Sequence, residues 1–158
     1  MTFNRDQRQL LRANIVTYSP ATFFIMMLVA VVVHMNAPAP FVDSVTGWVV
    51  GAVLLALSPV LTFWALRIRH SLYVPVVERT CTNFDVGPYR FSRHPVYVGF
   101  LLMMIGFGFV INSLIMLLFA AILFVFFTGI VIPEEERELE RHCREVYQDY
   151  KKRVRMWL

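Results

Sequence analysis

Residues 96–132 form an almost uninterrupted apolar stretch, and this stretch limits the possible folds more than any other feature of the sequence. As one α-helix it would be about 55 Å long, whereas the hydrocarbon core of a bilayer is about 30 Å thick. Asn112 and Ser113 interrupt it near its middle and predict a turn there. We therefore expect two helices of about the minimum spanning length. A single tilted helix, the alternative, would place the next residues on the opposite membrane face.

Two earlier apolar stretches, at about residues 15–35 and 45–66, are also long enough to cross a bilayer. Hydrophobic residues make up 58% of the chain and charged residues 16%, which is too apolar for an ordinary soluble domain. We predict an all-α integral membrane bundle of four transmembrane helices, followed by a cytosolic amphipathic C-terminal helix. Residues 1–158 then form one domain, in which residues 1–70 contribute the two N-terminal spans.

The basic residues indicate how these spans are oriented. Residues 36–46 contain no Lys or Arg, whereas residues 1–14 and 67–95 contain several Arg. Because cytoplasmic loops carry the excess of basic residues, both termini are expected in the cytosol. The formal net charge of +4 does not indicate a nucleic-acid partner, since the basic residues lie beside apolar spans. Cys81 and Cys143 both fall on the predicted cytosolic side, where disulfides are uncommon.

Glycines predict where the spans approach one another closely. Gly47 and Gly51 form a G-x-x-x-G pattern in the second span, which is a hint of helix packing that also occurs often by chance. Gly99, Gly106 and Gly108 lie in the third span, and we expect them to pack against the fourth.

The C-terminal part of the chain has the pattern of an amphipathic helix that begins at Pro133. Acidic residues come first and basic residues last, an order that suits the helix dipole. One face carries the apolar and aromatic side chains at helical spacing: Leu139, Cys143, Val146, Tyr147, Tyr150 and Val154. This helix could lie on the lipid headgroups, but we favour a helix that docks over a site, because its two tyrosines share the buried face.

A polar, turn-rich segment at residues 87–99 leads directly into the third span. Gly87 and Pro88 predict a turn, and Pro95 suits the first turn of a helix. Tyr89, Arg93, His94 and Tyr97 are thereby placed at the end of a membrane helix. After two spans the chain returns to the same face with the acidic residues Glu134, Glu135 and Glu136. We therefore expect the two polar motifs to meet.

These motifs follow one another in a characteristic order: G-P-Y-R-x-S-R-H-P-x-Y-x-G, two spans, E-E-x-x-L, then Y-x-x-Y-x-x-x-V-x-x-W. The set resembles the isoprenylcysteine carboxyl methyltransferases together with the related phospholipid methyltransferases. The resemblance covers residues 87–158. It departs from the family pattern at Cys143 and Arg144, where members usually have Phe-Gly. The apolar residues 130–132 also stand where eukaryotic prenylcysteine enzymes have a substrate-binding arginine.

The resemblance implies methyl transfer from S-adenosylmethionine at the cytosolic membrane face, with residues 87–158 as the cofactor-binding region. The implied cofactor-binding residues are Tyr89, His94, Pro95, Val96, Tyr97 and Glu135. Leu139 fixes the register of the acidic pair, so that Glu136 stands beside Glu135 and Glu134 is the extra acid. We take Arg93 and Glu136 as the candidate catalytic residues.

The chemistry of these residue types agrees with that assignment. A carboxylate such as that of Glu135 can hold an ammonium group by a charge-assisted hydrogen bond. The rings of Tyr89 and Tyr97 can contact adenine and attract a sulfonium through cation–π interaction. An in-line methyl displacement depends mainly on alignment and requires no metal. The histidines and cysteines show no metal-ligand spacing, and we predict no metal site.

Simpler interpretations of the same residues remain open. His94 could only cap the third helix, Arg93 could only neutralise lipid phosphates, and the acidic run could be a solvated helix start. For the whole protein, the alternatives are an NADPH-dependent membrane lipid reductase and a non-catalytic membrane scaffold. We expect a lipophilic or lipid-modified acceptor and membrane lipids as partners.

Overall fold

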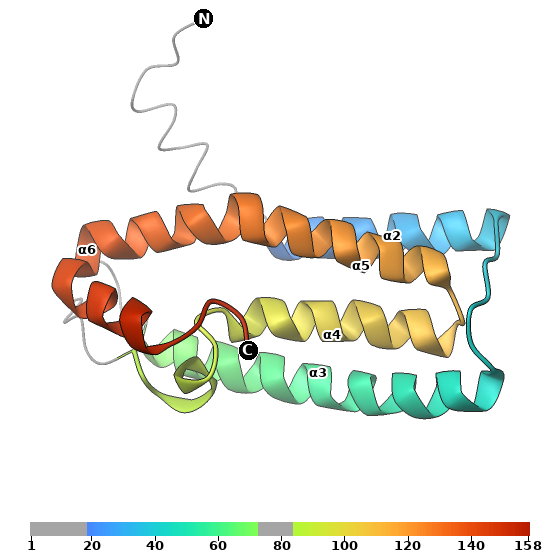
Figure 1. The fold of residues 1–158 in the computed structure, drawn as a ribbon, viewed down its shortest axis with the longest axis horizontal. Coiled ribbons are helices and arrows are strands. Elements are labelled where there is room, and N and C mark those ends of the chain that lie inside the picture. Colours follow the sequence, from blue (N-terminus) through green and yellow to red (C-terminus); the bar gives the residue numbers. More distant parts are fainter. Residues whose placement is uncertain (1–18, 73–83) are drawn as a thin grey trace, which may run out of the picture.

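The computed structural model describes residues 19–72 and 84–158, and every regular element in those ranges is helical. Figure 1 shows the arrangement. In chain order the elements are α2 (Ser19–Asn36), α3 (Ser44–Leu72), the 3₁₀ helix η1 (Gly87–Arg90), α4 (Pro95–Val110), α5 (Leu114–Phe126), the π-helical η2 (Phe127–Val131) and α6 (Ile132–Arg153).

The long helices run side by side, with α4 packed against both α3 and α5, and α2 packed against α5 (Figure 1). The buried core between them is apolar and includes Phe23, Phe100, Met104, Met116, Leu123 and Phe127. The outward faces are apolar as well: Phe24, Trp48 and Phe63 are more than half exposed. Among the described residues, Ser19–Asn36, Ser44–Ile68 and Leu114–Arg141 are long and apolar enough to cross a membrane, while Pro95–Val110 is shorter.

The predicted second span, residues 45–66, agrees with the apolar segment Ser44–Ile68, whereas the start of the first span at about residue 15 stays a prediction. The second span was expected to end before Arg67, but α3 continues to Leu72, because a helix can leave the apolar layer without ending. The first span was expected from about residue 15, and α2 begins at Ser19 in the structure; residues 15–18 lie outside the described part of the chain.

The predicted turn at Asn112 and Ser113 is confirmed. Asn112 adopts the left-handed conformation with φ 51°, and Ser113 caps α5 by accepting a hydrogen bond from the Met116 amide. The Asn112 side chain also binds the connection between α2 and α3. Its Oδ1 accepts from the amides of Phe41 (2.9 Å) and Val42 (3.0 Å), and its Nδ2 donates to the Val42 carbonyl (2.7 Å). The two connections therefore lie at the same end of the bundle.

Glycines allow α3 and α4 to approach closely, as the G-x-x-x-G pattern suggested. A Cβ atom at Gly51 would lie 2.8 Å from the carbonyl oxygen of Gly106. A side chain at Gly99 would collide with Thr62 of α3. The prediction that all three glycines of the third span face the fourth is thus wrong for Gly99 and Gly106, which face α3. Only Gly108 packs against α5.

The C-terminal helix begins within one residue of Pro133, as the sequence suggested, but it continues directly from the preceding span. α5, η2 and α6 follow one another without a gap through Pro133, and the amide of Ile132 donates to the Phe127 carbonyl in a π-type bond. This wider turn gives the proline ring room inside a helix. The direction changes later, at Cys143 (φ −122°, ψ 25°), after which the chain folds back toward the start of α4 (Figure 1). Contrary to the expectation from its predicted compartment, Cys143 is disulfide-bonded.

Candidate active site

The segment that leads into α4 is held by the C-terminal end of the chain. Ser92 Oγ donates a hydrogen bond to the Met156 carbonyl (3.2 Å) and accepts one from the His94 amide (3.2 Å). The Arg93 amide donates to the Arg155 carbonyl (3.0 Å). His94 stands directly before α4, and Pro95 occupies its first turn. The backbone of Arg93 and His94 is therefore fixed from two directions.

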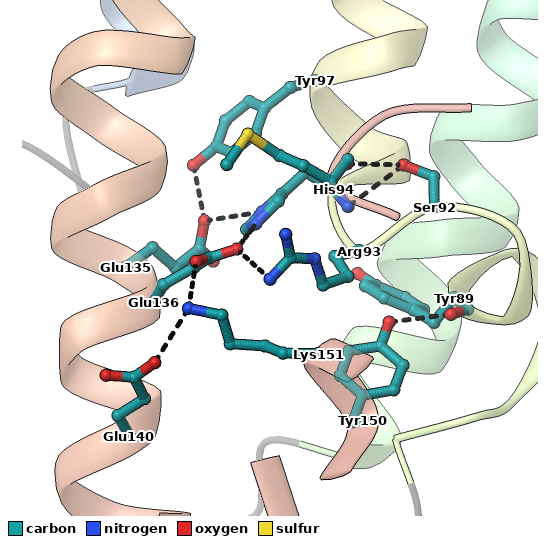
Figure 2. A network of polar contacts seen from close by, with 11 residues as sticks. Tyr89, Ser92, Arg93, His94, Tyr97, Glu135, Glu136, Glu140, Tyr150 and Lys151 are labelled. Atoms are coloured by element: carbon teal, nitrogen blue, oxygen red, sulfur yellow. Dashed lines mark hydrogen bonds and ion pairs between the residues drawn. The ribbon is translucent and has the colours of Figure 1, made fainter. Parts of the chain in front are cut away.

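His94 and Tyr97 meet Glu135, which confirms that the two polar motifs come together (Figure 2). Tyr97 Oη donates to Glu135 Oε2 at 3.0 Å, and His94 Nδ1 lies 3.6 Å from the same oxygen. The two rings stack with centroids 5.8 Å apart. All three residues are buried. A carboxylate is thereby held at the end of the apolar bundle by one phenol and one imidazole.

Glu136 links three cationic side chains (Figure 2). Its Oε1 lies 2.8 Å from Arg93 Nη1 and 3.2 Å from His94 Nε2, and its Oε2 lies 2.9 Å from Lys151 Nζ. Lys151 also pairs with Glu140 at 2.8 Å. Because α6 folds back after Cys143, Glu136 and Lys151 of one helix come together although fifteen positions separate them.

The carboxylates change the proton affinity of His94. Burial alone lowers the pKa of the imidazole, but its hydrogen bonds to Glu135 and Glu136, and their charges, outweigh that effect and raise the pKa above its usual value. The pKa of Lys151 is also raised, mainly by its hydrogen bond to Glu140. The site therefore favours positive charge on both side chains.

The remaining predicted residues surround this cluster or lie outside it. The Tyr89 carbonyl accepts a hydrogen bond from Tyr150 Oη (2.7 Å), which joins η1 to the folded-back part of α6. Pro95 and Val96 are buried in the first turn of α4. Glu134 pairs with Arg137 of the same helix at 2.7 Å, and the Arg137 side chain is exposed. The contacts of Glu134 therefore differ from those of Glu135 and Glu136.

A comparison with protein families decides the class of the protein. The family model described as phospholipid methyltransferase matches residues 45–149, which is more than half of the chain and reaches from α3 into α6. The chain belongs to the phospholipid methyltransferase family. No curated protein and no solved structure matches it significantly.

Because the chain belongs to a methyltransferase family, methyl transfer is the activity that the site has to support. The apolar helices indicate a membrane protein. The match begins earlier in the chain than the sequence motifs indicated, and it ends at residue 149. They began at Gly87, whereas the family match includes α3, the helix whose glycines pack on α4. The second span is therefore part of the methyltransferase fold and more than an anchor.

Sequence reasoning missed Lys151 and the contacts of residues 155 and 156. Lys151 follows Tyr150 in the Y-x-x-Y pattern and was counted only among the basic residues that end the helix. Nothing in the local sequence shows that it returns to Glu136, because that contact depends on the change of direction at Cys143. No group of three His, Cys, Asp or Glu side chains suited to a metal occurs among the described residues.

Proposed function

We propose that this chain transfers a methyl group from S-adenosylmethionine to a lipophilic acceptor at the cytosolic face of a membrane. The main observation in favour is the buried cluster in which His94 and Tyr97 of one polar motif contact Glu135 and Glu136 of the other. This cluster lies at the end of apolar helices in a member of a methyltransferase family.

The side chains of the cluster fit the groups that such a cofactor presents. S-adenosylmethionine, when bound, supplies an activated methyl group on a sulfonium. Glu135 would hold the ammonium group through a charge-assisted hydrogen bond, in exchange for part of its contact with Tyr97 and His94. The rings of Tyr89 and Tyr97 would contact adenine and favour the sulfonium. Pro95 and Val96 would form the wall of the pocket at the start of α4.

Arg93 and Glu136 are proposed to act by positioning. Glu136 forms an ion pair with Arg93 and also contacts His94 and Lys151, so it fixes the loop before α4 relative to both parts of α6. Alignment of donor and acceptor in a site that excludes water can supply most of the acceleration of a displacement reaction. A network that fixes three segments at once is suited to that task.

The proposed topology has four spans, with residues 1–14, 67–95 and 133–158 in the cytosol. In support, the connection at residues 37–43 and the turn at Asn112 are hydrogen-bonded to each other at the end of the bundle opposite the cluster. A cysteine introduced at Asp43 should react only with a reagent added outside the cell. Reaction from the cytosolic side would contradict this orientation.

The proposed acceptor is a lipid or a lipid-modified molecule that reaches the site from the membrane. The family match favours a lipid, and the side chains just before Pro133 are apolar, with Ile130 half exposed. We expect polar, water-soluble acceptors to be methylated more slowly than lipids. The reverse order would exclude a membrane route for the acceptor.

Calorimetry on the purified protein in detergent tests the cofactor assignment. S-adenosylmethionine should bind, and NADPH should not; binding of NADPH alone would favour the reductase, and binding of neither would favour the scaffold. Glu135→Gln should weaken S-adenosylmethionine binding by about tenfold to a hundredfold, because a hydrogen bond to a charged group is lost. The matched variant Glu134→Gln should change little, since Glu134 pairs with the exposed Arg137 of the same helix.

A further inference from the structure

Two buried hydrogen-bond donors near Glu136 have no hydrogen-bond partner among the described residues: Arg93 Nε and Tyr147 Oη. The Arg93 side chain is 10% exposed and Tyr147 is 1% exposed. Arg93 Nη1 forms an ion pair with Glu136 but no hydrogen bond. Buried donors are rarely left without an acceptor, because the loss of water is then not compensated.

The two donors belong to the same neighbourhood. Tyr147 precedes Lys151 by one turn of α6, and Lys151 contacts Glu136, which in turn contacts Arg93. The charges of Glu136, Arg93 and Glu135 all act on the Tyr147 phenol. One donor therefore comes from the loop before α4 and the other from the folded-back part of α6, and the charge of Glu136 acts on both.

The chemistry of the donors defines the acceptor that they would bind. Arginine cannot lose its proton in a protein and can only donate. Burial raises the pKa of the Tyr147 phenol, so this group also keeps its proton and can donate. Both oxygens of Glu136 already contact Arg93 Nη1, His94 and Lys151. Two buried donors near Glu136, one of them cationic, suit the oxygens of a carboxylate or a phosphate.

We propose that Arg93 Nε and Tyr147 Oη form a subsite for an anionic oxygen, beside the Glu135–Glu136 pair. The inference deepens the proposed function: the oxygens belong either to the carboxylate of the cofactor or to the phosphate of a lipid headgroup. Glu135 on one side and this subsite on the other would then hold the opposite charges of an amino-acid group, which fixes its orientation.

The subsite also connects ligand binding to the position of the C-terminal segment. Tyr147 reaches the cluster because the chain after Cys143 is docked, through Tyr150 Oη on the Tyr89 carbonyl and through the Arg155 carbonyl on the Arg93 amide. An anion bound by both donors would add a contact between these two segments. Ligand binding and docking should therefore strengthen each other.

Calorimetry on the full chain in detergent tests the subsite with two probes. S-adenosylhomocysteine carries the amino-acid group, and methylthioadenosine lacks it. For Tyr147→Phe we expect binding of S-adenosylhomocysteine to weaken by about tenfold or more, because a hydrogen bond to a charged group is lost, while methylthioadenosine binds unchanged. Arg93→Lys, which keeps the charge but loses the Nε donor, should show the same selectivity.

Tyr150→Phe is the matched control, because its hydroxyl is already bonded to Tyr89. This variant should weaken the binding of both probes to a similar extent, because it changes how the C-terminal segment docks. Native mass spectrometry of co-purified phospholipid distinguishes the second source of the anion. Loss of phospholipid from Tyr147→Phe, with unchanged S-adenosylhomocysteine binding, would assign the subsite to a lipid phosphate.

Unchanged binding of S-adenosylhomocysteine and unchanged phospholipid content in Tyr147→Phe would overturn the subsite. If the unaltered protein bound neither nucleoside probe, the proposed cofactor would be wrong. The phospholipid measurement would still decide whether Arg93 and Tyr147 bind an anion. The two failures can therefore be distinguished.

Discussion

The two ends of the helix bundle are each joined by one polar side chain, but the two side chains work in different ways. At one end Asn112, a neutral amide, makes three hydrogen bonds to backbone groups of residues 41 and 42. At the other end Glu136, a charged carboxylate, contacts Arg93, His94 and Lys151. Both residues hold together segments that are far apart in the sequence.

The difference between these ends indicates which of them is available for function. The acceptor and donor groups of the Asn112 side chain are both used by fixed backbone partners, which is the condition for a structural contact. Around Glu136, charge is concentrated in a buried place, and two neighbouring donors lack hydrogen-bond partners among the described residues. Buried donors of this kind are available to a bound ligand. We therefore expect stability to depend on one end and ligand binding on the other.

The largest effect should follow from Glu136→Gln. This change removes the negative charge between Arg93, His94 and Lys151, and breaking a buried ion pair costs about 3–5 kcal/mol. Binding of S-adenosylhomocysteine should fall by more than a hundredfold, as measured by calorimetry, because the loop before α4 and the folded-back part of α6 lose their common partner. Glu140→Gln, which touches only Lys151 of this group, should change binding far less. Similar losses in both variants would refute a special role for Glu136.

An intermediate effect, on stability alone, is expected for Asn112→Ala. The variant loses three hydrogen bonds and places alanine at φ 51°, so the free energy of unfolding should drop by about 1–3 kcal/mol. Thermal unfolding in detergent would show the drop, while the folded protein should bind S-adenosylhomocysteine as before. Asn112→Gly removes the same hydrogen bonds without the backbone strain, so its free energy of unfolding should drop by less. A clear loss of affinity in either variant would mean that the two ends are not independent.

The smallest effect, on stability, is expected for Lys151→Gln in comparison with Lys152→Gln. Lys151 is 32% exposed and pairs with Glu136 and Glu140, whereas Lys152 is 75% exposed and pairs with Asp149. Lys151→Gln should destabilise the protein by about 0.5–1 kcal/mol, and Lys152→Gln by less. Salt should reduce the difference between their melting temperatures, because exposed ion pairs are screened. Equal melting temperatures at low salt would show that Lys151 adds nothing to the cluster.

Much of the helical framework could be predicted because its signals are local. The long apolar stretch required a turn, and Asn112 was the residue best suited to a left-handed backbone there. The meeting of His94 and Tyr97 with the acidic pair followed from counting two helices between the motifs. For the turn and for the meeting of the motifs, the thickness of the membrane sets the length of the helices. A small number of residues at the helix ends therefore decides how the segments are arranged.

The folded-back part of α6 could not be predicted, because it depends on contacts between distant residues. Cys143 has non-helical backbone angles without a glycine or proline at that position to announce them. The departure from the Phe-Gly pattern was noticed at this residue, but it did not indicate the direction of the chain. Tyr147 could therefore be placed on the apolar face of the helix and Lys151 at its basic end, yet neither of them beside Glu136 and Arg93. The wide turn before Pro133 likewise arises from how the helix accommodates a proline ring, which periodicity does not reveal.

The shortness of α4 has a consequence for the membrane around the protein. Its 16 residues give a length of about 24 Å, several ångströms less than an average hydrocarbon layer. Such hydrophobic mismatch is relieved by local thinning of the lipid or by drawing the helix ends inward. In the proposed topology, drawing the cytosolic end of α4 inward carries His94, and with it the contacting Glu135 of α6, to the depth at which lipid headgroups begin. Membranes of different thickness would then present acceptor lipids to the same site at different heights, so that lipid composition becomes a determinant of the reaction rate.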